Sequence, residues 1–197
     1  MKHKGNTNPP GRQKIIEALT RLMWTKEFHA VTTAEIAEMA GVTEGLIYKY
    51  FKSKKELLHQ ALNELFTQFN QTIFERIAHK GAAIERLEII IHSSIEYYAA
   101  NRVFARILLL EVRNSPDYFS SAAYTRVKAY AGKILEIIQE GVRKGELKPE
   151  IDPLIFRNII LGAIEHACLG EIIFARELDA QAVTRHISTI LFNGAKA

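Results

Sequence analysis

The chain has 197 residues, of which 48% are hydrophobic and 24% charged, and its formal net charge is +4. This composition is that of a soluble globular protein large enough to bury a core without metals or disulfides. No apolar run reaches the roughly 20 residues that a membrane span needs, and the opening MKHKGNTNPPGRQK lacks the apolar segment of a secretory signal. With one cysteine, Cys168, the protein is expected to be cytoplasmic.

The excess positive charge lies near the N-terminus. Residues 1–60 contain ten basic and six acidic residues, whereas residues 61–197 contain sixteen of each. Such an asymmetry is typical of a segment that meets a polyanion. A chance imbalance of this size is the alternative, and charge alone does not decide between the two.

The chain is predicted to be all-α with about nine helices, because apolar residues recur at three- and four-residue spacing and strand signals are nearly absent. Residues 1–11 are polar and basic, with prolines and glycines typical of a disordered arm. Helices are expected at about 12–26, in two short pieces within 32–51, and then at 53–79, 82–100, 102–113, 120–144, from 152 onward, and at 179–192. Ser53 and Asp152 are predicted N-caps, and Gly145 a left-handed C-terminal residue.

The two short helices have clear boundary signals. Thr32 followed by Glu35 is a capping box, Gly41 can adopt the positive φ of a sharp turn, and Thr43 can cap the next helix. Ile47 then points back into the small core. This spacing predicts a helix-turn-helix, although an αα-hairpin within a bundle would have a similar pattern.

The surface of the second short helix favours the helix-turn-helix. Only Ile47 and Phe51 are expected to be buried, so packing explains this helix poorly. Around its C-terminal end the helix displays the side chains of Tyr48, Lys49, Tyr50, Lys52, Lys54 and Lys55. Such side chains suit phosphates on both sides of a major groove.

The stretch resembles the DNA-binding domain of the TetR family of transcriptional regulators. That family reads T-T-x-x-x-I-A-x-x-A-G-V-S-x-G-x-x-Y-x-H-F-x-S-K-E-x-L, and this chain reads VTTAEIAEMAGVTEGLIYKYFKSKKEL. The resemblance covers about residues 12–60. It implies a DNA-binding domain at 12–58, a ligand-binding and dimerisation domain at 59–197, and DNA contacts from Thr32, Thr43, Glu44, Gly45, Leu46, Tyr48, Lys49, Tyr50, Lys54 and Lys55.

Five positions depart from the family pattern. Val31 replaces the first Thr, Lys55 replaces an acid and adds positive charge, and Tyr50 replaces the usual His. Leu46 stands where a small polar residue is common, which favours contact with a thymine methyl group. Glu27 replaces the glycine that usually ends the first helix, so that corner is expected to use a different cap.

The C-terminal helices are predicted to form a two-fold four-helix interface. PLIFRNIILGAIEHACLGEIIF is apolar on most of its circumference and contains small residues that allow close helix approach. A helix-turn-helix needs two copies to read a palindrome, although intrachain packing is the alternative for each residue. The candidate interface residues are Ile159, Gly162, Ala163, His166, Ala167, Gly170, Val183, Ile187, Ile190 and Leu191.

A sensor cavity is expected between the two ends of the chain. In NRVFARILLLEVRNSP, α-helical periodicity places Arg102, Arg106 and Arg113 on one face and Glu111 on the other, so Glu111 needs either an arginine or a ligand as its partner. Aromatic residues nearby could line an apolar cavity, although most of them would be core in any bundle. The candidate lining residues are Tyr97, Tyr98, Phe104, Arg106, Leu108, Glu111, Tyr124, Phe156, Arg157 and His166.

The sequence therefore predicts a ligand-responsive regulator, a repressor that binds duplex DNA as a homodimer and is released by a small apolar effector. LLLEVRNSP also resembles the FadR-type branch, which implies an acyl-CoA effector. A protein-interaction adaptor is the alternative. No enzyme motif, cofactor site or membrane partner is expected. His92 and Glu96, four residues apart, are only two of the ligands that a metal requires, and Cys168 is expected to be a core residue.

Overall fold

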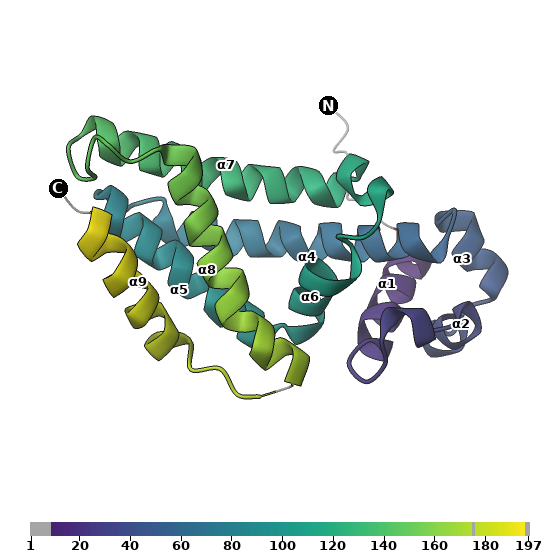
Figure 1. Cartoon of the computed structure of the whole chain (residues 1–197). Helices are drawn as coiled ribbons and strands as arrows, with labels where there is room; N and C mark the ends of the chain where they lie inside the picture. The colour runs from purple at the N-terminus through teal and green to yellow at the C-terminus, as the bar shows by residue number, and fades with distance from the viewer. Residues whose placement is uncertain (1–8, 175, 196–197) are drawn as a thin grey trace, which may run out of the picture.

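The structure, a computed structural model, describes residues 9–174 and 176–195 and is built from α-helices (Figure 1). The prediction of an all-α fold with about nine helices is confirmed over these residues. No described helix combines the length and apolar content of a membrane span. The helices are α1 (Pro10–Leu22), α2 (Thr33–Ala40), α3 (Glu44–Tyr50), α4 (Lys54–Ile77), α5 (Ala83–Ala100), α6 (Arg102–Arg106), α7 (Ala122–Arg143), α8 (Pro153–Phe174) and α9 (Ala180–Ala195).

Helix α4 is the spine of the molecule. It begins next to α1–α3 at one end and runs into the layer of α5–α9 at the other (Figure 1). Ser53 caps it, because its hydroxyl accepts a hydrogen bond from the Glu56 amide at 3.1 Å. The expected domain boundary between residues 58 and 59 falls inside this continuous helix. A single apolar core accordingly joins both parts, from Ile15 in α1 to Ile164 in α8.

The later helices pack around α4 with the ends that the sequence predicts. Helix α7 lies against α4 and α8, and α9 lies against α5. Gly145 takes φ +71° after α7, and the chain folds back so that Leu147 is fully buried. At the start of α8, the Asp152 carboxylate accepts hydrogen bonds from the amides of Leu154 and Ile155 at 2.8 and 3.0 Å.

Two predicted boundaries are wrong. The expected arm lies largely outside the described residues, but Pro10 and Gly11 belong to α1, because proline suits the first turn of a helix. Helix α1 also ends at Leu22 instead of residue 26. A short 3₁₀ turn at Phe28–Ala30 then leads to α2.

The helix expected at 102–113 is interrupted. It consists of α6 and a π-helical turn at Ile107–Glu111, and a 3₁₀ turn at Pro116–Ser120 follows. A π turn carries an extra residue, so side chains after it are rotated relative to an α-helix. The prediction that Arg106 and Arg113 share one helix face, opposite Glu111, is therefore wrong.

Gly141 is expected to be a packing constraint. A Cβ added there would lie 2.8 Å from the Ala83 Cβ and 3.0 Å from a Leu147 methyl group, whereas a Cβ at Gly132 on the same helix would meet nothing within 4 Å. We expect Gly141→Ala to lower the free energy of unfolding by about 1–3 kcal/mol through overpacking. The matched Gly132→Ala should raise it by roughly 0.5–1 kcal/mol. Urea unfolding at one protein concentration measures both, and equal effects would contradict the assignment.

Candidate functional site

The start of α2 is fixed by the predicted capping box. The Glu35 amide donates to the Thr32 hydroxyl at 3.2 Å, and the Glu35 carboxylate accepts from the Thr32 amide at 2.9 Å. Lys26 forms an ion pair with the same carboxylate. The Lys26 hydrogen bond, followed by those from Thr32, lowers the pKa of Glu35 to about 2. Glu35 therefore joins the end of α1 to the start of α2 as a charged group.

The corner between α2 and α3 has the predicted geometry. Gly41 takes φ +64°, and the Val42 amide donates to the Ala37 carbonyl at 2.9 Å. Ile47 and Phe51 are buried. The Thr33 hydroxyl also donates to the Glu44 carboxylate at 2.6 Å, although Thr43, at the N-cap, makes no side-chain cap. These contacts hold α3 across α2.

The outer face of α3 is exposed, with one correction. The candidate residues Thr32, Thr43, Glu44, Gly45, Tyr48, Lys49 and Lys55 are all exposed. Leu46 and Tyr50, however, are half-buried and turn toward the start of α1, where a Cβ on Gly11 would lie 3.3 Å from a Leu46 methyl and 3.6 Å from the Tyr50 ring. Leu46, predicted to contact a thymine methyl group, is thus partly covered, because α1 begins two residues earlier than predicted and reaches α3.

Lys54 faces the protein backbone. Its ammonium donates to the carbonyls of Val31 and Phe28 at 2.6 and 3.0 Å and lies 4.6 Å from the Phe28 ring centroid. Burial lowers its pKa. Lys54 was expected among the displayed lysines. Instead it holds the corner in which Glu27 replaces the family's glycine.

The structure contains a partly enclosed cavity of about 280 Å³ between α5, α7 and α8, next to the π turn. It brings together three of the ten predicted lining residues, Tyr98, Leu108 and Tyr124. The lining residues missed by the prediction are Phe66, Arg113, Tyr118, Phe119, Val127, Tyr130, Ala131, Leu161, Ile164 and Glu165. The amphipathic pattern of α7 could have indicated Val127 and Tyr130, but nothing local distinguishes cavity lining from core.

The other predicted lining residues do not border this cavity. Phe104 is core, Tyr97 donates to the Leu65 carbonyl at 3.4 Å, and Arg106 donates to carbonyls at the end of α1. Further along the chain, Glu111 is half-buried, Phe156 packs on Phe192, Arg157 bonds to Asn158, and His166 is exposed. Tertiary packing therefore places these predicted lining residues in the core, on the surface or against other parts of the chain.

An ion pair stands at the exposed side of the cavity. The Arg113 guanidinium lies 2.6 Å from the Glu165 carboxylate, and its Nε donates to the Leu108 carbonyl at 3.3 Å. In the π turn before Arg113, the Val112 amide donates to the Ile107 carbonyl at 3.2 Å, and this wider turn places Leu108 and Arg113 on one wall. Phe119 and Arg113 are exposed, whereas Phe66 and Tyr130 on the opposite side are buried. The cavity is thus apolar within and charged at its mouth.

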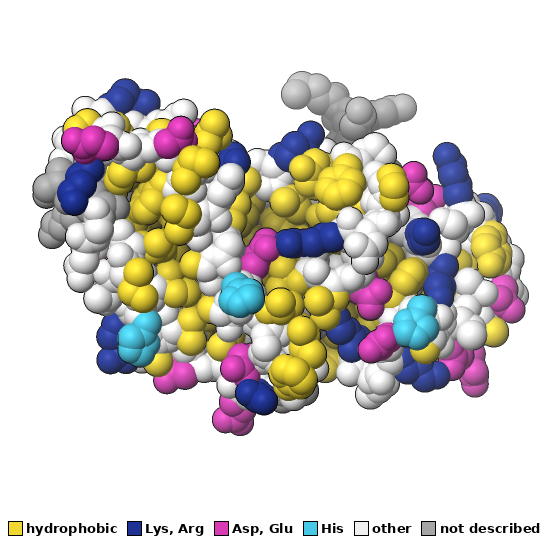
Figure 2. Space-filling view, in the orientation of Figure 1, with side chains coloured by type: hydrophobic (Ala, Val, Ile, Leu, Met, Phe, Trp, Pro, Cys, Tyr) yellow, Lys and Arg dark blue, Asp and Glu magenta, His cyan; other side chains and the backbone are white. Residues whose placement is uncertain are grey.

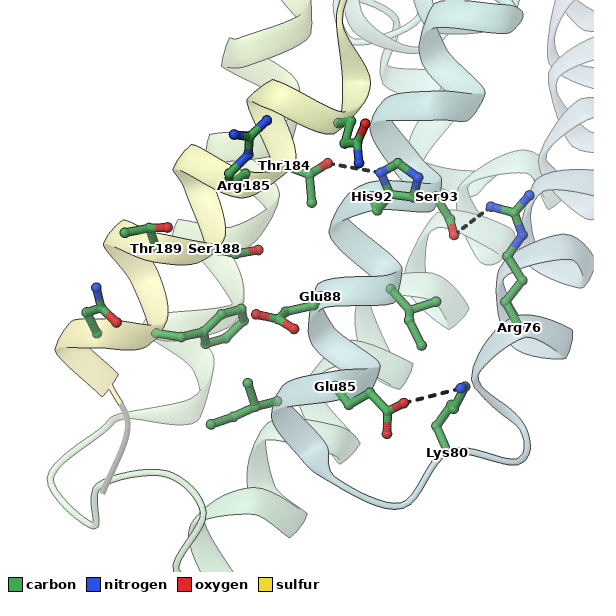
Figure 3. A pocket seen from close by; sticks show the side chains of 15 residues that line it. Arg76, Lys80, Glu85, Glu88, His92, Ser93, Thr184, Arg185, Ser188 and Thr189 are labelled. Carbon is green, nitrogen blue, oxygen red and sulfur yellow. Dashed lines mark hydrogen bonds and ion pairs between the residues drawn. The ribbon is translucent and has the colours of Figure 1, made fainter.

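A larger groove of about 880 Å³ runs between α5 and α9 (Figure 3). Most of its lining residues are polar or charged, and several are paired: Arg76 donates to Ser93 at 2.9 Å, Lys80 pairs with Glu85 at 3.2 Å, and His92 is 3.3 Å from the Thr184 hydroxyl. Such walls suit an apolar effector less well than the smaller cavity does.

The remaining chemical candidates have structural partners. Glu96 pairs with Arg76 at 2.6 Å, so the His92 and Glu96 pair is not held together for a metal. Within the described ranges, no three His, Cys, Asp or Glu side chains gather as a metal site. Cys168 is fully buried, and burial raises the pKa of its thiol to about 12.

Apolar side chains gather on the surface over α8 and α9 (Figure 2). Ile190 is 76% exposed, and Ile159, Phe174, Ile155 and Ile173 are also exposed. Of the predicted interface residues, Gly162, His166, Ile159 and Ile190 are exposed, whereas Ala163, Ala167, Gly170, Val183, Ile187 and Leu191 are half-buried within the chain. Contiguous exposed apolar surface of this kind marks an interaction face.

Comparisons with known proteins agree with this geometry. Residues 15–61 match the bacterial regulatory proteins of the tetR family, and residues 62–194 match the C-terminal region of YsiA-like proteins. The chain is 28% identical over 185 residues to the fatty acid metabolism regulator protein of Bacillus subtilis, covering 94% of this chain and 95% of that protein. It is 25% identical to the transcriptional repressor KstR2 of Mycolicibacterium smegmatis, covering 75% and 73%.

Solved structures show the same fold. The crystal structure of the regulator FadR from Bacillus subtilis in complex with stearoyl-CoA matches with a TM-score of 0.83 and 27% identity, covering 92% of this chain and 98% of that one. FadR from Bacillus halodurans matches with a TM-score of 0.84 and 24% identity, covering 95% and 97%.

The pKa of Glu35 gives a pH-dependent prediction. Its folded value of about 2 lies below the ordinary 4.5, so its contribution to stability is full above pH 4.5 and is lost as the pH falls through 2. We expect Glu35→Gln to be less stable than wild type at pH 7 and the difference to shrink steadily below pH 4.5. Thermal unfolding across this range measures it. Glu38→Gln, which removes a charge from the same helix, is the control, and a pH-independent difference for Glu35→Gln would contradict the assignment.

Proposed function

We propose that this chain, which belongs to the TetR family of bacterial regulatory proteins, represses transcription as a homodimer and releases its operator when it binds an acyl-CoA thioester. The main support for this proposal is the exposure of α3. This helix buries only Ile47 along its length and exposes Tyr48 and Lys49. In an αα-hairpin within a helical bundle, that face would pack against other helices. The family match supports DNA as its partner over a protein-interaction adaptor.

The side chains on and around α3 are proposed to contact different parts of the DNA duplex. Lys49 and Glu44 lie on the exposed face and would reach base edges, whereas Tyr48, Thr32, Thr43 and Lys55 would contact phosphates. Gly45 has open space beyond it, since an added Cβ would meet only the Thr43 hydroxyl, at 3.9 Å. Leu46 and Tyr50 would reach DNA from beside the start of α1, and Lys54 would act by holding the α1–α2 corner.

The proposed dimer face is the exposed apolar surface of α8 and α9. Pairing this surface with its copy forms a four-helix arrangement around a two-fold axis. A Cβ added at Gly162 or Gly170 would meet no neighbouring atom within 4 Å, so a partner helix can approach closely there. Val183, Ile187 and Leu191 pack against the chain's own core and would support the face from behind.

The 280 Å³ cavity is the proposed effector site. Leu108 lines the cavity. Two residues before it, the Arg106 guanidinium donates to the carbonyls of Met23 and Lys26, the latter at 2.8 Å, and so connects the cavity wall to the DNA-binding helices. An effector that displaced Leu108 would therefore pull on the end of α1. The effector shifts the dimer between two shapes only by its different affinity for each.

DNA recognition is tested with two lysine variants. We expect Lys55→Ala to weaken binding to every duplex and to reduce the slope of log affinity against log salt by about 1, because a phosphate contact is lost. Lys49→Ala should instead change the preferred bases. Fluorescence anisotropy on a selected operator and on shuffled duplexes, at several salt concentrations, measures both. Binding that is indifferent to salt and sequence in the wild type would overturn the regulator function.

Coupling is tested at Arg106. We expect Arg106→Leu to bind operator and effector separately but to lose most of the effector-induced drop in operator affinity, which is typically about 5–150-fold in allosteric proteins. The matched control is Arg102→Leu, since Arg102 on the same helix donates to the Arg176 carbonyl, away from α1. Operator affinity is measured with and without the tightest-binding member of an acyl-CoA series. Unchanged coupling in Arg106→Leu would exclude this route.

A further inference from the structure

We infer that the acyl group sensed by this protein is compact and carries an aromatic ring, in contrast to a long unbranched chain. The inference rests on the acyl-thioester function proposed above and concerns the selectivity of the same cavity. Three properties of the cavity support it: its volume, the character of its walls and its closed inner end.

The volume limits the size of the acyl group. The cavity measures about 280 Å³. If each heavy atom of a ligand takes roughly the 30 Å³ that a water molecule occupies in the liquid, the cavity holds about nine. A phenylacetyl group has eight carbons and one oxygen, which matches this capacity. A stearoyl group, with eighteen carbons, would need about twice the space.

The walls are unusually rich in rings. Six lining side chains are aromatic, namely Phe66, Tyr98, Tyr118, Phe119, Tyr124 and Tyr130. Three of them form a group near the mouth: the centroid of Phe119 lies 5.4 Å from that of Tyr118 and 5.2 Å from that of Tyr124. Ring planes that meet at steep angles present both faces and edges to the cavity. A ligand ring can take offset-stacked or edge-to-face positions against them, which a methylene chain cannot do.

The inner end is closed by a hydrogen-bonded pair. The Tyr130 hydroxyl lies 2.7 Å from the Ser94 hydroxyl, which donates to the Ile90 carbonyl at 2.6 Å. Ser94 is fully buried, and Phe66 beside Tyr130 is 1% exposed. A longer chain would have to separate these groups and leave buried hydroxyls unpaired, at a cost in affinity. A short, rigid acyl group fits in front of them and loses little conformational freedom on binding.

The mouth is suited to the thioester end of such a ligand. Arg113 and Glu165 stand there as a half-exposed ion pair. A phosphate-bearing CoA moiety would remain outside, where the Arg113 charge can face it. The ring would point inward toward Phe66 and Tyr130.

A four-member ligand series tests the inference by isothermal titration calorimetry on the full-length protein. The ligands are phenylacetyl-CoA, octanoyl-CoA, stearoyl-CoA and free CoA. Octanoyl-CoA is the matched control, since its acyl group has the same number of carbons and no ring. We expect phenylacetyl-CoA to bind about tenfold or more tightly than octanoyl-CoA, and stearoyl-CoA to bind more weakly than both.

The results distinguish a failure of the ring selectivity from a failure of the acyl-thioester function. Equal or tighter binding of octanoyl-CoA or stearoyl-CoA would overturn the ring selectivity and leave the acyl-thioester function standing. If no thioester bound more tightly than free CoA, the acyl-thioester function itself would fail, and the ring selectivity with it.

A substitution in the cavity wall tests whether its aromatic rings cause the preference for a ring-bearing acyl group. Phe119 is 50% exposed, so Phe119→Leu should fold. We expect it to weaken the binding of phenylacetyl-CoA more than that of octanoyl-CoA, so that the ratio of the two affinities falls by several fold. Trp24→Leu, which replaces an exposed ring outside the cavity, should leave the ratio unchanged. An unchanged ratio in Phe119→Leu would contradict the role of this ring.

Discussion

The carbonyl oxygens of the connector between α1 and α2 need hydrogen-bond partners, and this need ties α1 and α2 to α4 and α6. The last carbonyls of α1 are paired locally, since Arg21 accepts from the Trp24 amide and Leu22 from the amides of Thr25 and Lys26. Carbonyls of the connector that follows accept hydrogen bonds from side chains of other helices. Arg106 on α6 donates to the carbonyls of Met23 and Lys26. Lys54 on α4 donates to those of Phe28 and Val31. The corner that leads into α2 is therefore held by one cation from the start of α4 and one from α6, in the larger domain.

This arrangement explains why α3 can be so short. A seven-residue helix is not stable alone, and only Ile47 within it is buried. Its position comes from its neighbours: the capped start of α2, the left-handed Gly41, and the beginning of α1 against Leu46 and Tyr50. Because α1 is itself held from α4 and α6, the orientation of the exposed face depends on the larger domain. In the proposed mechanism, a small change near the cavity would therefore alter the orientation of α3 without any contact between ligand and DNA.

The π turn gives the cavity its chemical character. With α-helical spacing, Leu108 and Arg113 would lie on different sides of the helix. The extra residue in the turn brings them to one wall, where the Arg113 ion pair with Glu165 forms the mouth and Leu108 the adjoining apolar surface. Turns of this type store a less favourable backbone geometry. Their position here, between the cavity and Arg106, is the place where a change of shape would matter most.

The sequence by itself determined the helices and most of their ends. Thr32, Gly41, Ser53, Gly145 and Asp152 all cap as predicted, since capping depends on a few neighbouring residues and the backbone they adjoin. Only the tertiary structure decided which aromatic residues line a cavity, that Lys54 turns inward, and that Leu46 meets α1. A ring at helical spacing is equally suited to core or cavity wall, and a lysine equally to solvent or to a carbonyl. What distinguishes them is which distant helix passes nearby, and packing between helices far apart in the chain sets that.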